Sequence, residues 1–599
     1  MLSALSLLIL VFLVVGFWHI LFAIFRWLVS KLKPSKSENQ QESHGPVVGF
    51  GIKLLKDLLV GLTMMAVTIP LHHHPLLENP EDASMDFVIK NNHCKENESC
   101  EFYDKIKALN IPPMVLVDVD DKTFKQWQDE GEELLVTPRK KIAILIEKAV
   151  RDEAKAIVVD IFLTQKIPME KNQWHQGDKI LYNYLMNDYP SYCRSSKNCP
   201  PIIMIRDVIP TNESQQDIGF GEQQPFYKPQ ESFLDEAIEK SSPHVSWASP
   251  LFVVSEFDYV LRRWWLWHHI CDEKNSKPRV SLSIQLSIIG AMGDKNFSEI
   301  TSHLPQVKED CSNENYRYTP LPLSKEQLKF FENELGIKQI EGGEVTGGGI
   351  SPRIMFTLPW PKKENKSNVL TVLSASTYEK AQTSSDLKGS IVIIGSSRSD
   401  TRDIHKTPIG EMPGMLVIAN AIYSLLLNQG ELKNFSTSWV MVLWKVIMIL
   451  LFFVAGTAIA SSLPRFFYWP LMFLTTALIW FFLELRSAEL LKQGVWIDFS
   501  LPLVAILFHQ IADDCHGSKE KSKKSREGQP ELGNPNGDKK VSQDIPPVDL
   551  NKEVEKQEKQ ENNQKVDTVK NGNEQQGLEK AGIEIEVKGG EQKTNKTNG

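Results

Sequence analysis

Four aspartates follow two apolar stretches of this 599-residue chain, and they are the first candidates for chemistry. Asp118, Asp120 and Asp121 close the stretch "MVLVDVDD", and Asp160 lies near the end of "AIVVDIF". Carboxylates held close together act in acid–base chemistry or hold a hard cation. They also cap helices and pair with arginines, for which the candidates are Arg139, Arg206, Arg262 and Arg263. No Gly-x-Ser-x-Gly or metalloprotease helix motif supports catalysis, so we expect a structural or ligand-binding role and no enzyme.

A second candidate is the loop "GSSRSDTRD", which follows another apolar stretch. Its small residues can turn backbone N–H groups toward an anion, and its arginines add positive charge. A purely structural loop is the more common case, and this loop is our best candidate for binding a ligand; the residues concerned are Ser396, Ser397, Arg398 and Asp403. No cofactor is expected, because the glycine-rich residues 342–349 match neither the dinucleotide nor the phosphate-loop spacing.

The elements that position these residues alternate between strands and helices. Residues 114–121 and 156–162 read as buried strands, and a helix with Thr137 as its N-cap and Pro138 in its first turn lies between them. Strand, helix and strand at this interval predict a parallel βαβ unit. Further strands are expected near Ile203 and over 389–397, with a helix over 417–427. The predicted fold class is an α/β sandwich with a mostly parallel sheet.

Five apolar runs predict membrane spans at 2–25, 47–71, 446–463, 466–483 and 495–512. The second run is interrupted by Lys53, Lys56 and Asp57, so an interfacial helix is its alternative. Basic residues follow the first and last runs, which places those ends in the cytoplasm. Residues 72–437 would then be an exported domain, between membrane segments at 1–71 and three spans within 438–513. The lipid bilayer is therefore an expected partner.

The composition of the whole chain excludes a nucleic-acid-binding protein of the basic kind, because 67 basic residues face 75 acidic ones. The tail at 514–599 has no aromatic residue after His516 and no apolar periodicity. Such a segment cannot bury enough apolar surface to offset its ordering entropy, so we predict that it is disordered.

Six of the seven cysteines lie in the predicted exported region, and an even number there fits disulfides in an oxidising compartment. The equal spacings of two pairs suggest two small loops, and the remaining pair would close a third; the residues are Cys94, Cys100, Cys193, Cys199, Cys271 and Cys311. The connectivity stays open, because six cysteines allow 15 pairings. A zinc site is the rival interpretation, although the spacing is wider than that of the usual zinc knuckle.

Several segments together resemble the CHASE2 domain, an extracytoplasmic sensory module of bacterial receptors. "VLVDVDD" is similar to the first strand of that family, and "FDYVLRR", with Asp258, Arg262 and Arg263, resembles its acidic-to-arginine hairpin. The most specific likeness is "GSIVIIGSSRSDTRDIHKTPIGEMPGMLVIANAIYSLL". The resemblance covers about residues 50 to 513.

This resemblance implies a sensor in a bacterial cytoplasmic membrane that responds to an unknown extracytoplasmic ligand. Family members usually continue into a kinase or cyclase domain, and here the polar tail stands in that place. We therefore expect a separate cytoplasmic signalling partner at the tail, and the family also suggests a homodimer. The alternative is a non-signalling membrane scaffold that keeps the sensor fold.

Overall fold

The computed structural model of the chain describes residues 75–434, apart from internal gaps, together with residues 470, 474, 477, 481 and 484–496. The longer gaps are 95–100, 168–173, 211–223, 341–351 and 361–368. The predicted spans at 2–25, 47–71 and 446–463 and the tail at 514–599 lie outside the described residues, as do most residues of 466–483 and 495–512. No helix within the described part is long and apolar enough to cross a membrane.

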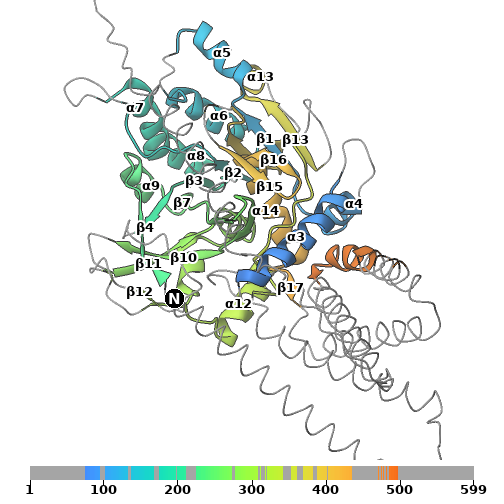
Figure 1. The fold of residues 1–599 in the computed structure, drawn as a ribbon. Coiled ribbons are helices and arrows are strands. Elements are labelled where there is room, and N and C mark those ends of the chain that lie inside the picture. The colour runs from blue at the N-terminus through green and yellow to red at the C-terminus, as the bar shows by residue number, and fades with distance from the viewer. Residues whose placement is uncertain are drawn as a thin grey trace, which may run out of the picture. The chain divides into compact units, whose positions relative to one another are not determined.

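The centre of the domain is a six-stranded parallel sheet (Figure 1). Its strands follow the order β13-β1-β14-β2-β3-β7. Their bounds are β1 Met114–Asp118, β2 Ala156–Val159, β3 Ile202–Ile205, β7 Val245–Ala248, β13 Leu370–Ser374 and β14 Ile391–Gly395.

Helices cover both faces of this sheet because its strands are apolar on both faces. Along β1, Met114 and Leu116 face one apolar core, while Val115 and Val117 face the other. Parallel strands buried in this way read as continuous apolar runs. Helices α6 (Arg139–Arg151), α9 (Asp235–Ser241) and α13 (Ala375–Lys380) pack on one face, and α10 (Ile284–Met292) and α14 (Gly414–Asn428) on the other. The predicted α/β sandwich is confirmed.

The predicted βαβ unit is parallel, but its two strands are not neighbours. Strand β14 lies between β1 and β2, and its Ile393 pairs with Leu116 on one side and Val158 on the other. A crossover fixes the direction of two strands but leaves room between them for a later strand. The helix start is also corrected: Pro138, not Thr137, is the N-cap of α6, which has no side-chain cap.

The remaining elements surround the sandwich. A second sheet has the order β11 (Lys277–Leu282), β10 (Trp267–Asp272), β6 (Tyr227–Pro229) and β4 (Val208–Pro210). The two-stranded pairs are β5 (Gln224–Pro225) with β12 (Arg317–Tyr318), β8 (Phe252–Val254) with β9 (Leu261–Trp264), β15 (Ile404–Thr407) with β16 (Gly410–Pro413), and β17 (Lys433–Asn434) with β18 (Val495–Trp496). The other helices are α3 (Pro75–Asn92), α4 (Glu101–Ala108), α5 (Asp121–Asp129), α7 (Gln176–Asn183), the π-helix η2 (Tyr184–Asp188), α8 (Tyr189–Ser195), α11 (Phe297–Ser302) and α12 (Lys325–Leu335).

Disulfides join two of the three cysteine pairs that the spacing suggests. Cys193 is bonded to Cys199, and Cys271 to Cys311. Cys94 is also disulfide-bonded, while Cys100 lies outside the described residues. The rival zinc interpretation has some support in the geometry. Possible ligand atoms of Cys193, Cys199 and His244 lie within 4.8 Å of one another. The two sulfur atoms are bonded to each other, however, which favours the disulfide.

A largely buried ionic cluster joins α3 to the β8–β9 hairpin, and its members are Asp82, Asp86, Asp258, Arg262, Arg263 and Arg353. Arg353 is 1% exposed and bridges two carboxylates, with Nη1 2.7 Å from Asp82 and Nη2 2.6 Å from Asp86. Arg262 donates to both Asp86 and Asp258. The cluster therefore holds a helix from the start of the domain against residues far along the chain.

The 484–496 segment packs on the domain although residues 435–483 separate it from β17. Its strand β18 pairs in parallel with β17, with Val495 opposite Lys433. Its helical residues 484–491 lie beside α4 (orange in Figure 1), where Lys105 Nζ donates to the carbonyl oxygen of Lys492 at 2.8 Å. Trp496 is fully buried in the apolar core that also contains α14.

Candidate functional site

The C-terminal edge of β1, β14 and β2 brings the predicted site residues together. Asp118 lies opposite Gly395 in the register of β1 and β14. On the other side of β14, the backbone N–H of Asp160 donates to the carbonyl oxygen of Ile394 at 2.7 Å. Ligands of open parallel sheets usually bind at this edge. Because β14 lies between β1 and β2, the loop that follows β14 begins between Asp118 and Asp160, which belong to separate strand ends.

Asp118 is held by the loop that follows β14. Ser397 donates to its carboxylate from the backbone N at 2.8 Å and from Oγ at 2.6 Å. Burial raises the pKa of Asp118 to about 6, against the opposing effect of these two hydrogen bonds. Ser396 Oγ donates in turn to the carbonyl oxygen of Val119 at 2.9 Å. The N–H of Ser397, which the anion hypothesis would use, thus already faces a carboxylate of the protein.

Asp120 and Asp121 lie at the start of α5. Asp120 is the N-cap, and its Oδ1 accepts the N–H of Thr123 at 2.7 Å. Asp121 Oδ1 lies 3.6 Å from Nε of Arg398, whose guanidinium stacks on Phe124 with 3.1 Å to the ring centroid. Asp121 is 82% exposed, so this ion pair contributes little to stability. The structural roles expected of these two aspartates, capping and ion pairing, are both present.

The arginines predicted to pair with the strand-end aspartates lie elsewhere, and that prediction is wrong. Arg139 Nε is 3.8 Å from Asp178, and Arg206 Nη1 is 3.0 Å from Asp235. Arg262 and Arg263 belong to the ionic cluster. Within the described residues it is Arg398, from the neighbouring loop, that pairs with Asp121.

Asp160 and Asp403 are a second pair of carboxylates, on the far side of β14 from Asp118. Burial first, and the charge of Asp403 second, raise the pKa of Asp160 well above its usual range. Within the described part of the chain, the buried Oδ2 of Asp160 has no hydrogen-bond partner. Asp403 Oδ1 lies 3.0 Å from Nε2 of His405. Gly414 leaves room for this carboxylate, since a Cβ there would be 2.5 Å from Asp403 Oδ1.

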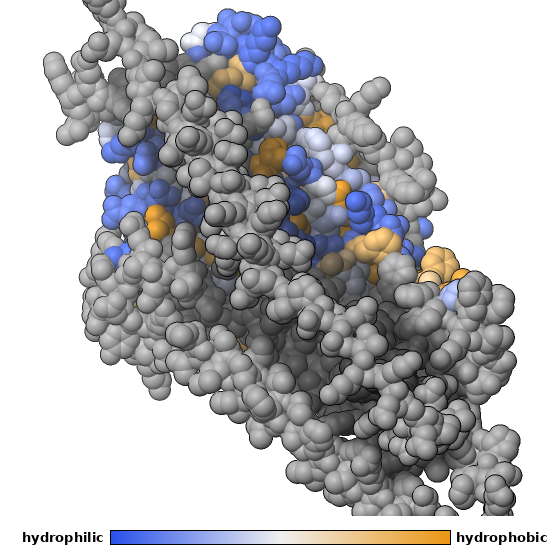
Figure 2. Space-filling model, viewed as in Figure 1, coloured by the Kyte–Doolittle hydropathy of each residue, from blue (hydrophilic) through white to orange (hydrophobic). Residues whose placement is uncertain are grey.

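This edge is suited to proton-linked or cation-linked recognition. A carboxyl group whose pKa burial raises, as at Asp160, takes up or releases a proton when its surroundings change. Helix α5 begins at Asp121, close to this edge, and its surface is strongly hydrophilic (Figure 2). Sequence reasoning missed His405; the available signal was its position two residues after Asp403. The ligand-binding role of the eight predicted residues stays a prediction.

The raised pKa of Asp118 predicts that stability falls as pH rises. The folded state binds this proton more tightly than the unfolded state, because the pKa moves from 3.8 to about 6. The stabilising contribution is complete below about pH 4 and lost as pH rises through about 6, a change of about 3 kcal/mol. Asp160 acts in the same direction. Thermal unfolding between pH 4 and 8 should therefore show a smaller pH dependence in Asp118→Asn than in the wild type.

The exposed Asp129 provides the control for this experiment. Asp129→Asn, at the end of α5, should keep the pH dependence of the wild type. An unchanged slope in Asp118→Asn would contradict the assignment of this titration to Asp118.

The chain was compared with known protein families, and residues 62–458 match the model of the CHASE2 domain. The match spans about two thirds of the chain and includes the central sheet and the whole strand-end site. No curated protein and no solved structure matches the chain. The likeness seen in the motifs of β1, the β8–β9 hairpin and the β14–α14 region is thus supported over the length of the domain. The chain belongs to the CHASE2 family of sensory domains.

Proposed function

We propose that this chain is a receptor-like protein of a bacterial cytoplasmic membrane. Its CHASE2 domain senses an extracytoplasmic stimulus, and the predicted spans relay a rearrangement to a separate partner that contacts the tail. The match to a sensory family supports the sensing role. The way the domain holds the segments next to the predicted spans supports the relay.

The observation that carries the proposal is the parallel pairing of β17 with β18. The apolar run at 446–463 comes after β17, and the run at 495–512 begins within β18. The two strands run in the same direction where they pair, so the chain passes this edge of the domain twice in the same sense. It has to return in between, which agrees with the predicted alternation of the three C-terminal spans.

Helix α3, which follows the predicted second span, is also joined to the folded domain. Helix α3 follows the run at 47–71, and the ionic cluster joins it to the β8–β9 hairpin. Asn91 near the end of α3 donates to Glu484 at 3.1 Å. Segments next to three predicted spans thus contact one folded core, which is the arrangement that a relay needs.

Photo-crosslinking from the tail in living cells tests the proposal. A crosslinkable amino acid at Lys521 or Lys540 should capture a kinase, a cyclase or a regulator. Capture of envelope components alone would instead favour the scaffold function.

A thiol-labelling control establishes the topology that the cross-linking assumes. Leu485 is 53% exposed, so a cysteine introduced there should react with a membrane-impermeant maleimide added to intact cells. The native Cys515, placed in the cytoplasm by the predicted spans, should react only after the membrane is permeabilised. Labelling of both positions, or of Cys515 alone, in intact cells would overturn the proposed topology.

A further inference from the structure

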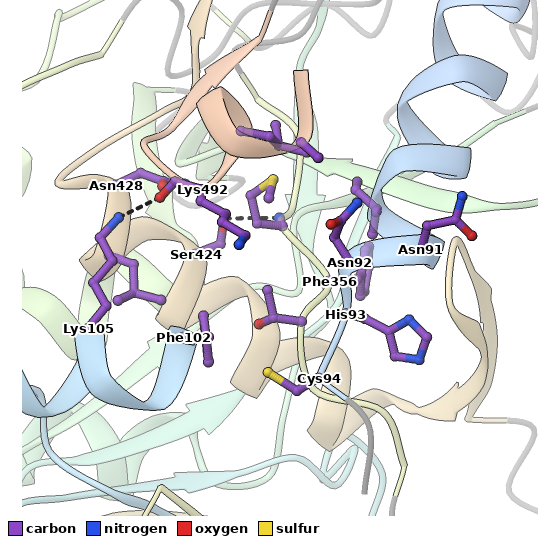
Figure 3. A pocket seen from close by; sticks show the side chains of 16 residues that line it. Asn91, Asn92, His93, Cys94, Phe102, Lys105, Phe356, Ser424, Asn428 and Lys492 are labelled. Carbon is purple, nitrogen blue, oxygen red and sulfur yellow. Dashed lines mark hydrogen bonds between the residues drawn. The ribbon is translucent and has the colours of Figure 1, made fainter. Parts of the chain in front are cut away.

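A cavity of about 270 Å³ lies where α3, α4, α14 and the 484–496 segment meet (Figure 3). Most of its wall is apolar, with Phe102 from α4, Phe356 from the irregular stretch at 354–360, and Leu491 from the 484–496 segment. This composition, apolar with a few placed polar groups, is typical of small-molecule sites. The cavity lies apart from the strand-end site, and no residue lines both.

The polar part of the wall combines neutral side chains with two lysines, Lys105 and Lys492. Figure 3 shows Lys105 reaching from α4 toward Lys492, whose carbonyl oxygen accepts its hydrogen bond. The described lining residues include no aspartate or glutamate. An apolar chamber with two lysines and no carboxylate attracts an anion that carries an apolar group.

Two further polar groups in the wall point to a ligand. Among the described residues, Nδ2 of Asn428 and Oγ1 of Thr357 are buried and have no hydrogen-bond partner. Buried polar atoms are nearly always paired in native proteins, so such exceptions call for a bound molecule or water. Both residues line this cavity.

We propose that the cavity binds an amphiphile with one apolar chain and an anionic head group, such as a medium-chain carboxylate. The apolar wall buries the chain, and the lysines pair with the head group. The volume is at the small end of the range for ligand cavities, so one chain fits and a two-chain phospholipid does not. The ligand would contact α3, α14 and the 484–496 segment together, and its role as the sensed stimulus rests on the proposed function.

Photolabelling tests the site on the full chain in nanodiscs of zwitterionic phospholipid. A diazirine derivative of decanoate should label peptides that contain Phe356 or Leu491. Unlabelled decanoate should compete, whereas acetate, which lacks the chain, and decanol, which lacks the charge, should not. Equal competition by decanol, or labelling elsewhere, would overturn the proposal. This comparison uses the wild-type chain, so it does not depend on how any variant folds.

Two lysines on one helix provide a matched pair of variants. Lys105 lines the cavity, whereas Lys107 is exposed and lies outside it. Lys105→Gln should raise the decanoate concentration for half-maximal competition roughly tenfold, because it removes one charge-assisted hydrogen bond. Lys107→Gln should leave that concentration unchanged. The same value in both variants would contradict the assigned head-group position.

Binding and relay can fail separately in these experiments. If decanoate binds the cavity but tail cross-links are unchanged by it, the cavity assignment stands and the relay does not. If tail cross-links form with a signalling partner but decanoate does not label the cavity, the cavity assignment is wrong and the relay stands.

Discussion

Arg353→Ala is expected to lower the free energy of unfolding of the CHASE2 domain by about 3–5 kcal/mol. The guanidinium bridges Asp82 and Asp86, and both carboxylates lie on α3. Its removal leaves Asp82, which is 5% exposed, with less positive charge to offset its desolvation. An intact buried ion pair adds little net stability. Removing Arg353 leaves Asp82 and Asp86 desolvated with fewer partners, and this explains the large expected loss of unfolding free energy.

Chemical denaturation of the full chain and hydrogen exchange of α3 measure this effect. Arg279→Ala, at an exposed position of β11, is the matched control and should change stability by less than about 0.5 kcal/mol. Arg353→Lys should restore little, because a single ammonium cannot reproduce two parallel guanidinium bonds to separate carboxylates. A loss in Arg353→Ala no larger than that in Arg279→Ala would refute the role assigned to the cluster.

Arg353→Ala also tests how α3 is connected to the rest of the domain. With the bridge removed, α3 should exchange its amide protons faster than β1 and β14, whose residues are fully or nearly fully buried. The cluster is then a connection between α3 and the β8–β9 hairpin, and not a support of the central sheet. A relay needs connections of this kind, which transmit a displacement without unfolding the core.

The strands and helices around the site could be predicted because their signal is local. Continuous apolar runs identify β1, β2 and β14, since strands of a parallel sheet are buried on both faces. The position of β14 between β1 and β2 could not be predicted, because it depends on a pairing between residues more than 200 positions apart. Apolar periodicity carries no information about strand order.

In the candidate site, too, the local features could be predicted and the long-range contacts could not. The edge carboxylates could be found from their place at strand ends, because the C-terminal edge of a parallel sheet collects such residues. Their partners could not: Ser397 reaches Asp118 over a separation of 279 residues, and the predicted arginines pair elsewhere. Two aspartates of the ionic cluster, Asp82 and Asp86, were also missed, because they lie in a polar stretch whose sequence gives no sign of burial.

Trp496→Ala is expected to release the 484–496 segment from the domain. Trp496 is fully buried in the core shared with α14, and truncation of a buried tryptophan typically costs about 3–5 kcal/mol. The pairing of β17 with β18 covers only two residues on each strand, and Trp496 is the largest of the three side chains that this segment buries in the core. The loss should therefore appear as local opening, with faster hydrogen exchange over residues 484–496.

Leu485→Ala is the matched control, because Leu485 is 53% exposed in the same segment and its truncation should change stability by less than about 0.5 kcal/mol. Hydrogen exchange of β1 and β14 should stay slow in both variants, which separates undocking from unfolding. Tail cross-links to a signalling partner should then change in Trp496→Ala and persist in Leu485→Ala. If the tail contacts are the same in both while the segment opens in only one, the docked segment is not part of the relay. The proposed relay would then have to use α3, which the ionic cluster joins to the rest of the domain and which follows the predicted span at 47–71.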